Sequence, residues 1–524
     1  MQIVVPMTGV GLRFARAGYR DLKPLIPVDG MPMIEHVVRM FPGEKDFLFI
    51  CTDEALARTA MRSVLERIAP EGRIVAIPPH KLGPVHAVLE AGKHIRREQP
   101  VIVNYCDFSA DWDYADFRRT VAERNCAGAI TAYRGFHPHS LGPNLYAYMR
   151  EHDGHLLEIR EKHCFTGDRM SEYASAGTYY FRNGGLLLDY FQKAVARGLS
   201  TNGEFYASSP YNLLVEDKLE VLIYELKRFL QWGTPEDLEE YQGWSRYFAE
   251  YSDWKPRLPA GGGTNLIPMA GSGVRFAGMG YRDPKPLVAV SGTPMVQRAL
   301  QSLPPAKNWI SICQSAHLRD PRFAPALRVN GFNCRITEAA DLTQGQLCSC
   351  LLAREQADPE QPLLVAPCDA AFVYDTGRYA QLISNPENDC LVWTFRNHPH
   401  ANRNPQQYGW LTLNADGSIQ NVICKAHPGG AVQEAPGITG AFWFRKARFL
   451  WDAADQIIAQ NRRVNGEFYV DSAVRALVEQ GRRACIFPVR HYLCFGTPDD
   501  VRTYEYWESY FRGAPHHPYR GEAA

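Results

Sequence analysis

The chain repeats itself once along nearly its whole length, and this repeat limits the possible folds more than any other feature. The segment Val5–Phe14 returns as Ile267–Phe276, a shift of 262 residues, with its glycines, arginine and phenylalanine in the same order. Later, Asn202–Tyr206 returns as Asn465–Tyr469 at a shift of 263 residues. A period this long excludes a solenoid and predicts two copies of a whole domain.

Length and composition agree with two domains. A chain of 524 residues with 45% hydrophobic residues exceeds what one hydrophobic core usually organises. Between the copies, Lys255–Gly263 combines proline with a run of glycine, which is the composition of a flexible linker. We therefore expect one domain over residues 1–250, a linker over 251–264 and a second domain over 265–524.

The charge balance argues against two classes of partner. Lysine plus arginine and aspartate plus glutamate both total 57, so the chain has no overall attraction for nucleic acid or an anionic membrane. The first residues lack a signal-peptide pattern, and no apolar run is long enough to span a bilayer. Thirteen cysteines without CxxC spacings favour reduced thiols. We expect a cytoplasmic protein with no nucleic acid or membrane partner.

Short apolar runs alternate with helical patterns in each copy. In the first copy, buried strands are predicted at Gln2–Val5, Asp46–Ile50 and Val101–Tyr105, and helices at Pro32–Met40 and Val85–Ile95. This alternation is typical of βαβ units. It predicts an α/β fold of two tandem Rossmann-like domains, each with a largely parallel mixed sheet flanked by helices. Such sheets bind ligands at the carboxyl ends of their strands.

A glycine-rich turn follows the first strand of each copy, and two cations follow the turn. In the first copy these residues are Gly9, Gly11, Arg13 and Lys23. In the second copy they are Gly271, Gly273, Arg275 and Lys285. Glycines let backbone N–H groups approach phosphate oxygens, and the cations supply fixed positive charge. A glycine pair alone would suit an ordinary turn, but the repeated cations favour a phosphate site. The spacing fits neither the P-loop nor the dinucleotide-binding fingerprint.

These motifs resemble those of the sugar-phosphate nucleotidyltransferase family, whose signature runs Ala-Gly-Gly-x-Gly-x-Arg, Pro-Lys-Pro-Leu and Gly-x-Pro-Met. The second copy keeps Ala270–Arg275, Pro284–Leu287 and Gly292–Met295. The first copy has Thr8 in place of the alanine and Leu22 in place of the first proline. The opening Pro-Met-x-Gly-x-Gly-x-Arg-Phe is similar to the capsular or surface-polysaccharide subgroup. The resemblance extends along nearly all of both copies.

The resemblance implies roles for the glycine-rich segments and their cations. The glycines of the first turn would bind the nucleotide, and the arginine and lysine of each copy would be catalytic. Gly83 lies in a segment similar to the one that contacts the nucleobase in the family, and Gly345 occupies the same place in the second copy. A helix N-terminus that only packs is the alternative for this segment.

An aspartate ends an apolar strand in each copy. Asp107 follows Val101–Tyr105, and Asp369 stands at the matching position. In the family this aspartate binds Mg²⁺, a hard cation suited to carboxylate and phosphate oxygens. Asp113 and Asp375 follow six residues later, where a helix cap and a functional role are both open.

The acceptor side is implied by matches further along each copy. Lys162 and Lys425 match the lysine that commonly holds the acceptor phosphate, although only the first copy keeps a glutamate, Glu161, before it. The glycine of the acceptor-side segment is Gly177 in the first copy and Gly440 in the second. A His-Pro-His motif also recurs, and we hypothesise that it contacts the acceptor phosphate through His137 and His398.

The sequence departs from the family at the second metal-binding aspartate. That position is Gln231 in the first copy and Cys494 in the second. Either the metal ion is held by fewer protein ligands or another acid substitutes. The candidates are Glu204, Glu467 and Asp471.

The resemblance implies transfer of a nucleoside monophosphate from an NTP to a phosphorylated acceptor, with Mg²⁺ as cofactor. Precursor synthesis for a surface or capsular polysaccharide follows from the subgroup. Three alternatives stay open: one copy regulates or scaffolds while the other catalyses, two active copies take different acceptors, or the chain senses a nucleotide without turnover. A homo-oligomer is also left open, because aromatic segments recur near the end of each copy.

Overall fold

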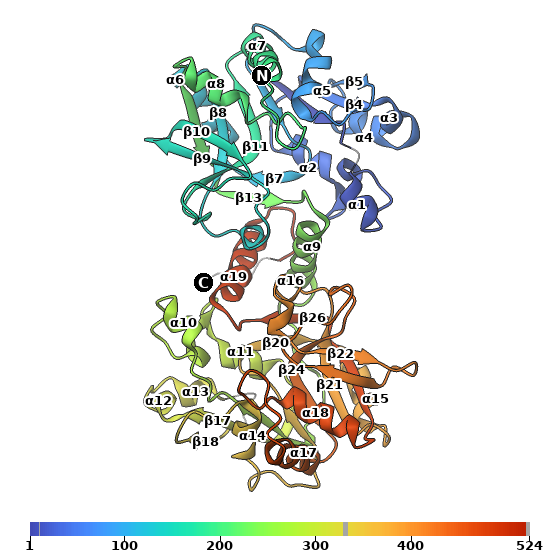
Figure 1. Cartoon of the computed structure of the whole chain (residues 1–524). Coiled ribbons are helices and arrows are strands. Elements are labelled where there is room, and N and C mark those ends of the chain that lie inside the picture. Colours follow the sequence, from blue (N-terminus) through green and yellow to red (C-terminus); the bar gives the residue numbers. More distant parts are fainter. Residues whose placement is uncertain (10, 329–333, 520–524) are drawn as a thin grey trace. The chain divides into compact units, whose positions relative to one another are not determined.

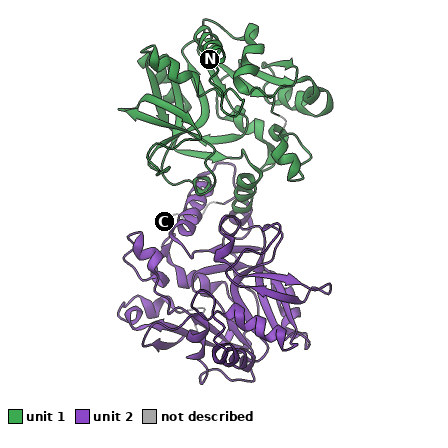
Figure 2. Cartoon of the chain, in the orientation of Figure 1, with its two compact units in different colours: residues 1–245 green, residues 246–524 purple. Residues whose placement is uncertain are grey.

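The computed structural model describes residues 1–9, 11–328 and 334–519 (Figure 1). The described chain divides into two compact units, Met1–Ser245 and Arg246–Ala524 (Figure 2), which we call unit 1 and unit 2. The division into domains over residues 1–250 and 265–524 stays a prediction.

Unit 1 is built on a mixed sheet. Its strands lie in the order β5 (Arg73–Ile77), β4 (Phe47–Thr52), β1 (Gln2–Met7), β6 (Val101–Asn104), β11 (Tyr173–Phe181), β8 (Gly128–Tyr133), β12 (Val221–Glu225), β10 (His155–Glu161) and β9 (Ala147–His152). Smaller ladders join β7 (Phe108–Asp111) to β13 (Arg228–Gln231), and β2 (Pro27–Val28) to β3 (Met31–Pro32).

Unit 2 repeats this arrangement. Its sheet has the order β18 (Arg335–Ala339), β17 (Ala306–Gln314), β14 (Gly261–Pro268), β19 (Leu363–Val365), β24 (Gly437–Phe444), β21 (Cys390–Phe395) and β25 (Ala484–Pro488), with β22 (Trp410–Leu413) and β23 (Ile419–Ile423) attached through β24. The small ladders are β20 (Ala370–Val373) with β26 (His491–Cys494), and β15 (Ala289–Val290) with β16 (Thr293–Pro294).

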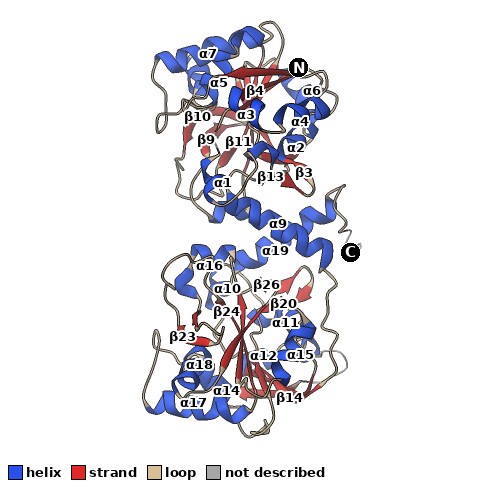
Figure 3. Cartoon of the chain, turned by 90° about the vertical axis from the view of Figure 1, so that its right-hand side faces the viewer, coloured by secondary structure: helices blue, strands red, loops and turns tan. Residues whose placement is uncertain are grey.

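Helices flank both sheets (Figure 3). Those whose first residue lies in unit 1 are α1 (Leu12–Arg16), α2 (Met33–Arg39), α3 (Asp53–Arg58), α4 (Met61–Ile68), α5 (Pro84–Glu90), α6 (Tyr114–Arg124), α7 (Gly184–Ala196), α8 (Pro210–Glu216) and α9 (Pro235–Glu250). Those of unit 2 are α10 (Val274–Gly278), α11 (Met295–Gln301), α12 (Ser315–Leu318), α13 (Phe323–Ala326), α14 (Gln346–Leu351), α15 (Thr376–Ser384), α16 (Pro399–Arg403), α17 (Ala447–Ala459), α18 (Val470–Glu479) and α19 (Pro498–Gly513).

Each sheet buries both of its faces. In β1, Val4 belongs to a core covered by α5, α7 and α8, whereas Ile3 and Val5 belong to one covered by α2, α4 and α6. Successive strand residues point to opposite faces, so a continuous apolar run is what a strand covered on both sides requires. In unit 2, Leu266 and Ile267 divide between two cores in the same way.

The predicted fold class is confirmed. In unit 1, β1 runs parallel to β4 and β6, and β4 runs parallel to β5. β11 runs antiparallel to both β6 and β8, which makes the sheet mixed. Each expected strand and helix of the first copy is present, with bounds that differ by one or two residues at most ends. The helix expected over Val85–Ile95 is the exception, because it ends at Glu90 and a short 3-10 turn, Gly92–His94, follows.

The glycine run between the copies has a different role from the one expected. Gly261–Gly263 begin β14, so the expected linker over 251–264 is wrong for its last residues. Gly261 donates its backbone N–H to the Pro305 carbonyl at 3.0 Å. A β-carbon on Gly263 would overlap the Pro362 backbone. Gly263 therefore lies where the neighbouring backbone leaves no room for a side chain.

Two expectations about the whole chain can be compared with the structure. All thirteen cysteines are unpaired thiols, as the absence of CxxC spacings predicted. Within the described residues, no helix is both long enough and apolar enough to cross a membrane.

Candidate functional site

Each unit has a pocket where the central parallel strands end. The cavity of unit 1 measures about 410 Å³ and that of unit 2 about 480 Å³. Gly11 and Gly273 line these pockets, each at the residue before a short helix and in the left-handed region, with φ of +63° and +64°. Glycine adopts this conformation at less cost than residues with a β-carbon, so the second glycine of each Gly-x-Gly meets a backbone requirement at the pocket.

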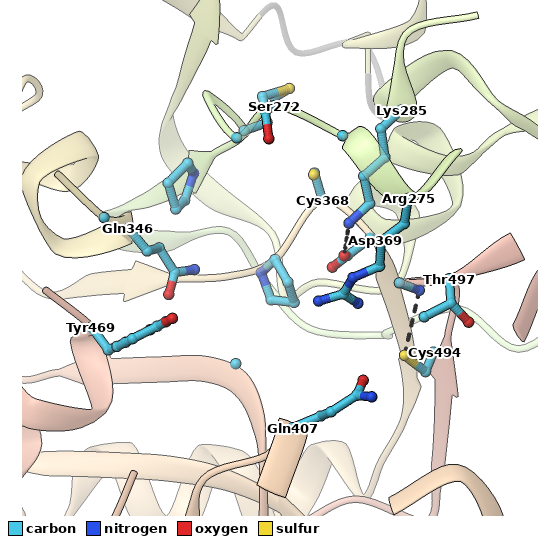
Figure 4. Close-up of a pocket in the computed structure, with 18 of the residues that line it drawn as sticks. Ser272, Arg275, Lys285, Gln346, Cys368, Asp369, Gln407, Tyr469, Cys494 and Thr497 are labelled. Atoms are coloured by element: carbon cyan, nitrogen blue, oxygen red, sulfur yellow. Dashed lines mark hydrogen bonds and ion pairs between the residues drawn. The ribbon is translucent and has the colours of Figure 1, made fainter. Parts of the chain in front are cut away.

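The predicted nucleotide-binding and catalytic residues come together at these pockets. In unit 1 the lining includes Gly9, Gly11, Arg13, Lys23, Gly83 and Asp107. In unit 2 it includes Gly271, Gly273, Arg275, Lys285, Gly345 and Asp369. Figure 4 shows Arg275, Lys285 and Asp369 converging on one part of the unit 2 pocket. Chain segments about 80 residues apart therefore supply one charged cluster in each unit.

A lysine and the strand-end aspartate form an ion pair in both units. Lys23 Nζ lies 2.5 Å from Asp107 Oδ2 and also donates to the Gly233 carbonyl at 3.0 Å. Lys285 pairs with Asp369 in the same way. Burial alone would lower the pKa of Lys285, but the Asp369 carboxylate more than offsets this effect, so the pKa is raised and the lysine stays cationic.

The segments expected to contact the nucleobase are held against a second part of the chain. In unit 1, Phe205 donates its backbone N–H to the Leu82 carbonyl, and its own carbonyl accepts from Val85. A β-carbon on Gly83 would lie 2.8 Å from the Phe205 backbone, and one on Gly345 would lie 2.5 Å from the Phe468 carbonyl. The recurring Asn-Gly-Glu-Phe-Tyr segment thus packs against Gly83 in unit 1 and Gly345 in unit 2 and leaves no room for a side chain there.

The pockets offer few carboxylates for a metal ion. Gln231 replaces the second aspartate of the family near Asp107, and Cys494 replaces it near Asp369. Among the described residues, no group of three or more His, Cys, Asp or Glu side chains could hold a metal ion. Magnesium can be held by one carboxylate when phosphate oxygens and water supply the other ligands. The donor set therefore fits an ion that is bound together with a nucleotide.

The other acids considered for the site have different surroundings. Asp113 and Asp375 accept backbone N–H groups at the starts of α6 and α15, which confirms the helix-cap alternative. Glu204 lines the pocket of unit 1 and accepts a hydrogen bond from the Tyr206 hydroxyl at 2.5 Å. Glu467 and Asp471 line the pocket of unit 2. A role in metal binding stays a prediction for these three.

The lysines and glycines predicted for the acceptor side line the same pockets. Lys162 and Lys425 both have left-handed backbones, with φ of +56° and +51°, and both lie over a tyrosine ring, Tyr206 or Tyr469. This backbone conformation is uncommon for lysine, and its presence in both units shows that the two lysines share one local chain conformation. The acceptor-side glycines, Gly177 and Gly440, line the same pockets.

The first histidine of each His-Pro-His motif lies away from the cavities. Neither His137 nor His398 is among the described residues that line the two pockets. Burial lowers the pKa of both side chains to about 4, so both are neutral at pH 7. Neutral, buried imidazoles are poor phosphate ligands, and the acceptor-phosphate role expected for His137 and His398 is a prediction that this placement does not support.

His137 should instead make unit 1 sensitive to acid. Its folded-state pKa of about 4 lies below the ordinary histidine value of about 6.5, so the unfolded chain binds the proton more tightly. The contribution of neutral His137 to the free energy of unfolding is fully present above pH 6.5 and is lost as the pH falls toward 4. The loss reaches about 2 kcal/mol at pH 5. Urea unfolding at pH 7 and pH 5 should therefore show a smaller loss of stability in His137→Phe than in the parent. The exposed His152, changed to Asn, is the matched control, and an equal loss in all three proteins would contradict the assignment.

The sequence reasoning missed one histidine–aspartate pair in the unit 2 pocket. His400 Nδ1 lies 3.0 Å from Asp500 Oδ1, and Asp500 also accepts from the Thr497 backbone and hydroxyl at the start of α19. The recurrence of His-Pro-His was a usable signal, but we chose the first histidine of the motif. In unit 2 it is the second that reaches the pocket.

Comparison with known proteins assigns the chain to a family. The family described as the MobA-like NTP transferase domain matches residues 4–165 and again residues 266–449. None of the curated proteins matches the chain.

Solved structures similar to the chain include the nucleoside-diphosphate-sugar pyrophosphorylase from Vibrio cholerae RC9, at 20% identity and a TM-score of 0.39 over 46% of this chain and 99% of that one. A putative glucose-1-phosphate thymidylyltransferase from Bacillus anthracis has 17% identity and a TM-score of 0.38, covering 46% of this chain and 94% of that one. The inositol-1-phosphate CTP transferase from T. maritima has 13% identity and a TM-score of 0.38, covering 49% and 99%.

Proposed function

The chain belongs to the MobA-like NTP transferase domain family, and on that premise we propose that each unit transfers a nucleoside monophosphate from an NTP to a phosphorylated acceptor with release of pyrophosphate. The observation that carries the proposal is the cluster of one arginine, one lysine and one aspartate beside a glycine-rich turn. It is present in both pockets with the same lysine–aspartate pair.

The proposed reaction needs no side-chain nucleophile. An acceptor phosphate oxygen attacks the α-phosphorus of the NTP, and the bond to the β-phosphate oxygen breaks to release pyrophosphate. Arg13 and Lys23, or Arg275 and Lys285, supply positive charge where the leaving pyrophosphate gains negative charge. Catalysis then comes from positioning and charge neutralisation.

Asp107 and Asp369 are the residues that would hold Mg²⁺ in this proposal. When bound, the ion would neutralise phosphate charge and orient the phosphate oxygens. The lysine that pairs with each aspartate holds the carboxylate beside the glycine-rich turn.

The acceptor side of the proposal rests on Lys162 and Lys425. Each ammonium group lines its pocket with the acceptor-side glycine of the same unit, Gly177 or Gly440. A sugar phosphate or a similar small phosphate ester suits this arrangement, and precursor synthesis for a surface or capsular polysaccharide is the proposed setting. The site geometry favours two catalytic units over a single one, because neither unit lacks a member of the charged cluster.

The test is a screen for pyrophosphate release. The full chain would be assayed with Mg²⁺, each of ATP, CTP, GTP, UTP and dTTP, and a panel of phosphorylated acceptors. We expect release that depends on both one NTP and one class of acceptor. NTP binding without pyrophosphate release across the whole panel would instead favour a nucleotide sensor, which is the second reading of this fold.

A further inference from the structure

A carboxylate near the acceptor-side lysine lines each pocket, but it comes from a different part of the fold in each unit. In unit 1 it is Glu161, at the end of β10, which accepts a hydrogen bond from the Ser208 hydroxyl. The aligned positions in unit 2 are Cys424 and Asp471. The acid and its small partner have therefore exchanged places, and in both units the acid is the member of the pair that lines the pocket.

Asp471 is buried at the start of a helix in unit 2. It is 7% exposed and lies in the first turn of α18, where the helix dipole favours an anion. Burial raises the pKa of Asp471, and Lys425 partly offsets this effect. Burial and the nearby Asp471 carboxylate also raise the pKa of the Cys424 thiol to about 12, so the thiol stays protonated. The Asp471 carboxylate thus takes the place beside the lysine that Glu161 has in unit 1.

A third substitution makes room for the moved carboxylate. Gly409 of unit 2 aligns with Ala147 of unit 1, which pairs with Glu161 across the β9–β10 ladder. A β-carbon on Gly409 would overlap Asp471 Oδ2 and would lie 2.9 Å from an Ile438 side-chain carbon. An alanine at this position is compatible with Ser208 but not with an aspartate. The residues at these three aligned positions, which are Ala147, Glu161 and Ser208 in unit 1, are therefore coupled, and all three differ in unit 2.

The wall around the carboxylate differs in the same region. In unit 1, Ser175 donates to the Tyr179 hydroxyl at 2.9 Å, and the Tyr105 hydroxyl accepts from the Ala207 backbone at 3.2 Å. Tyr105, Ser175 and Tyr179 line the pocket with Glu161. The aligned residues of unit 2 are Pro367, Ile438 and Phe442. None of these three side chains carries a polar atom. Conversely, Gln407 and Thr439 line the unit 2 pocket at positions where unit 1 has Leu145 and Ala176, so the two pockets place their polar groups differently.

We propose that the two units take different phosphorylated acceptors, with Glu161 and Asp471 as the specificity-determining carboxylates. Each unit takes the acceptor whose hydroxyl groups match the polar groups of its own pocket. This inference rests on the proposed function. A site built to hydrogen-bond a substrate hydroxyl discriminates strongly against an analogue that lacks it, because its own polar groups are then left unpaired.

The experiment measures each unit separately in the full chain. Asp369→Asn leaves unit 1 as the reporting site, and Asp107→Asn leaves unit 2. Pyrophosphate release would be followed with glucose 1-phosphate and with glycerol 3-phosphate, using the NTP that the screen selects. We expect the ratio of kcat/KM for the two acceptors to differ between the units by about tenfold or more. Equal ratios would overturn this inference alone, whereas an inactive parent protein would overturn the proposed function and this inference with it.

A transplant tests whether the three positions carry the difference. In the chain with Asp369→Asn, the set Ala147→Gly, Glu161→Cys and Ser208→Asp should shift the acceptor ratio of unit 1 toward that of unit 2. A shift in the ratio, with NTP KM unchanged, is an effect that a merely structural role would not produce. An unchanged ratio in a folded variant would contradict the assignment of the carboxylates.

The packing of Asp471 can be tested without turnover. Gly409→Ala should lower the melting temperature by about 5 °C, because the added methyl group meets the carboxylate. Adding Asp471→Ser should restore most of the loss, since a serine is what unit 1 places opposite its alanine. If Gly409→Ala melts like the parent, or if the second change brings no recovery, the three positions are not coupled and the inference fails.

Discussion

Replacing Asp107 and Asp369 together by asparagine should reduce pyrophosphate release by about 10³-fold or more. Both variants keep the shape of the side chain but remove the charge that would hold Mg²⁺ and that pairs with the lysine of each unit. Loss of about 4 kcal/mol of transition-state stabilisation corresponds to this factor. The measurement is a continuous pyrophosphate assay with saturating NTP and acceptor.

The single variants and a matched control separate the possible explanations. Each single change should silence one unit and leave the other active. Asp113→Asn and Asp375→Asn change acids only six residues away, but asparagine also caps helices well, so these variants should keep parent activity. Parent-level release from the double variant would exclude Asp107 and Asp369 as functional residues. Full loss from one single variant would mean that only one unit catalyses.

Substituting alanine for Gly345 should cost unit 2 much of its stability. Its φ of +124° lies in a region that residues with a β-carbon rarely adopt, and the β-carbon would lie 2.5 Å from the Phe468 carbonyl oxygen and 2.6 Å from its backbone nitrogen. Both atoms belong to backbone that is hydrogen-bonded to Gln344 and Leu347, so it cannot move away easily. We expect the free energy of unfolding to fall by about 3 kcal/mol, or roughly 6–12 °C in melting temperature for a domain of this size.

Gly271→Ala is the control for this prediction. Gly271 lies in the glycine-rich turn of the same pocket, yet no atom lies within 4 Å of an added β-carbon and its φ is not in the left-handed region. Its stability should stay within about 0.5 kcal/mol of the parent. Similar melting temperatures for Gly271→Ala and Gly345→Ala would show that the close approach to Phe468 is wrong.

The fold was largely predictable because its signals are local and repeated. The apolar runs at β1, β4 and β6 mark strands covered on both faces, and the same pattern recurs one domain later. The glycine-rich segment was misread as a linker because composition alone does not distinguish a flexible glycine from one packed against a neighbouring backbone. Gly263 is of the second kind, since Pro362 lies where its β-carbon would be.

The candidate site was predictable to a lesser extent. Lys23 and Asp107 were both identified, but their contact joins residues 84 positions apart along the chain. In unit 2, His398 was chosen over His400 because the sequence holds no measure of burial, and it is His400 that lines the pocket. Gly409 carried no signal at all, because its importance depends on a carboxylate that approaches it from another element.

The sequence by itself predicted the duplication, and it determined the α/β fold class and the residue types gathered at each glycine-rich turn. These properties follow from residue spacing, hydrophobic periodicity and backbone requirements, and each of these patterns occurs in both copies. Only the tertiary structure decided which of those residues meet, and it showed that Glu161 and Asp471 serve equivalent pockets from different elements. The physical reason is that a pocket wall is assembled from distant segments, so a carboxylate can move from one segment to another while the local patterns of both stay the same.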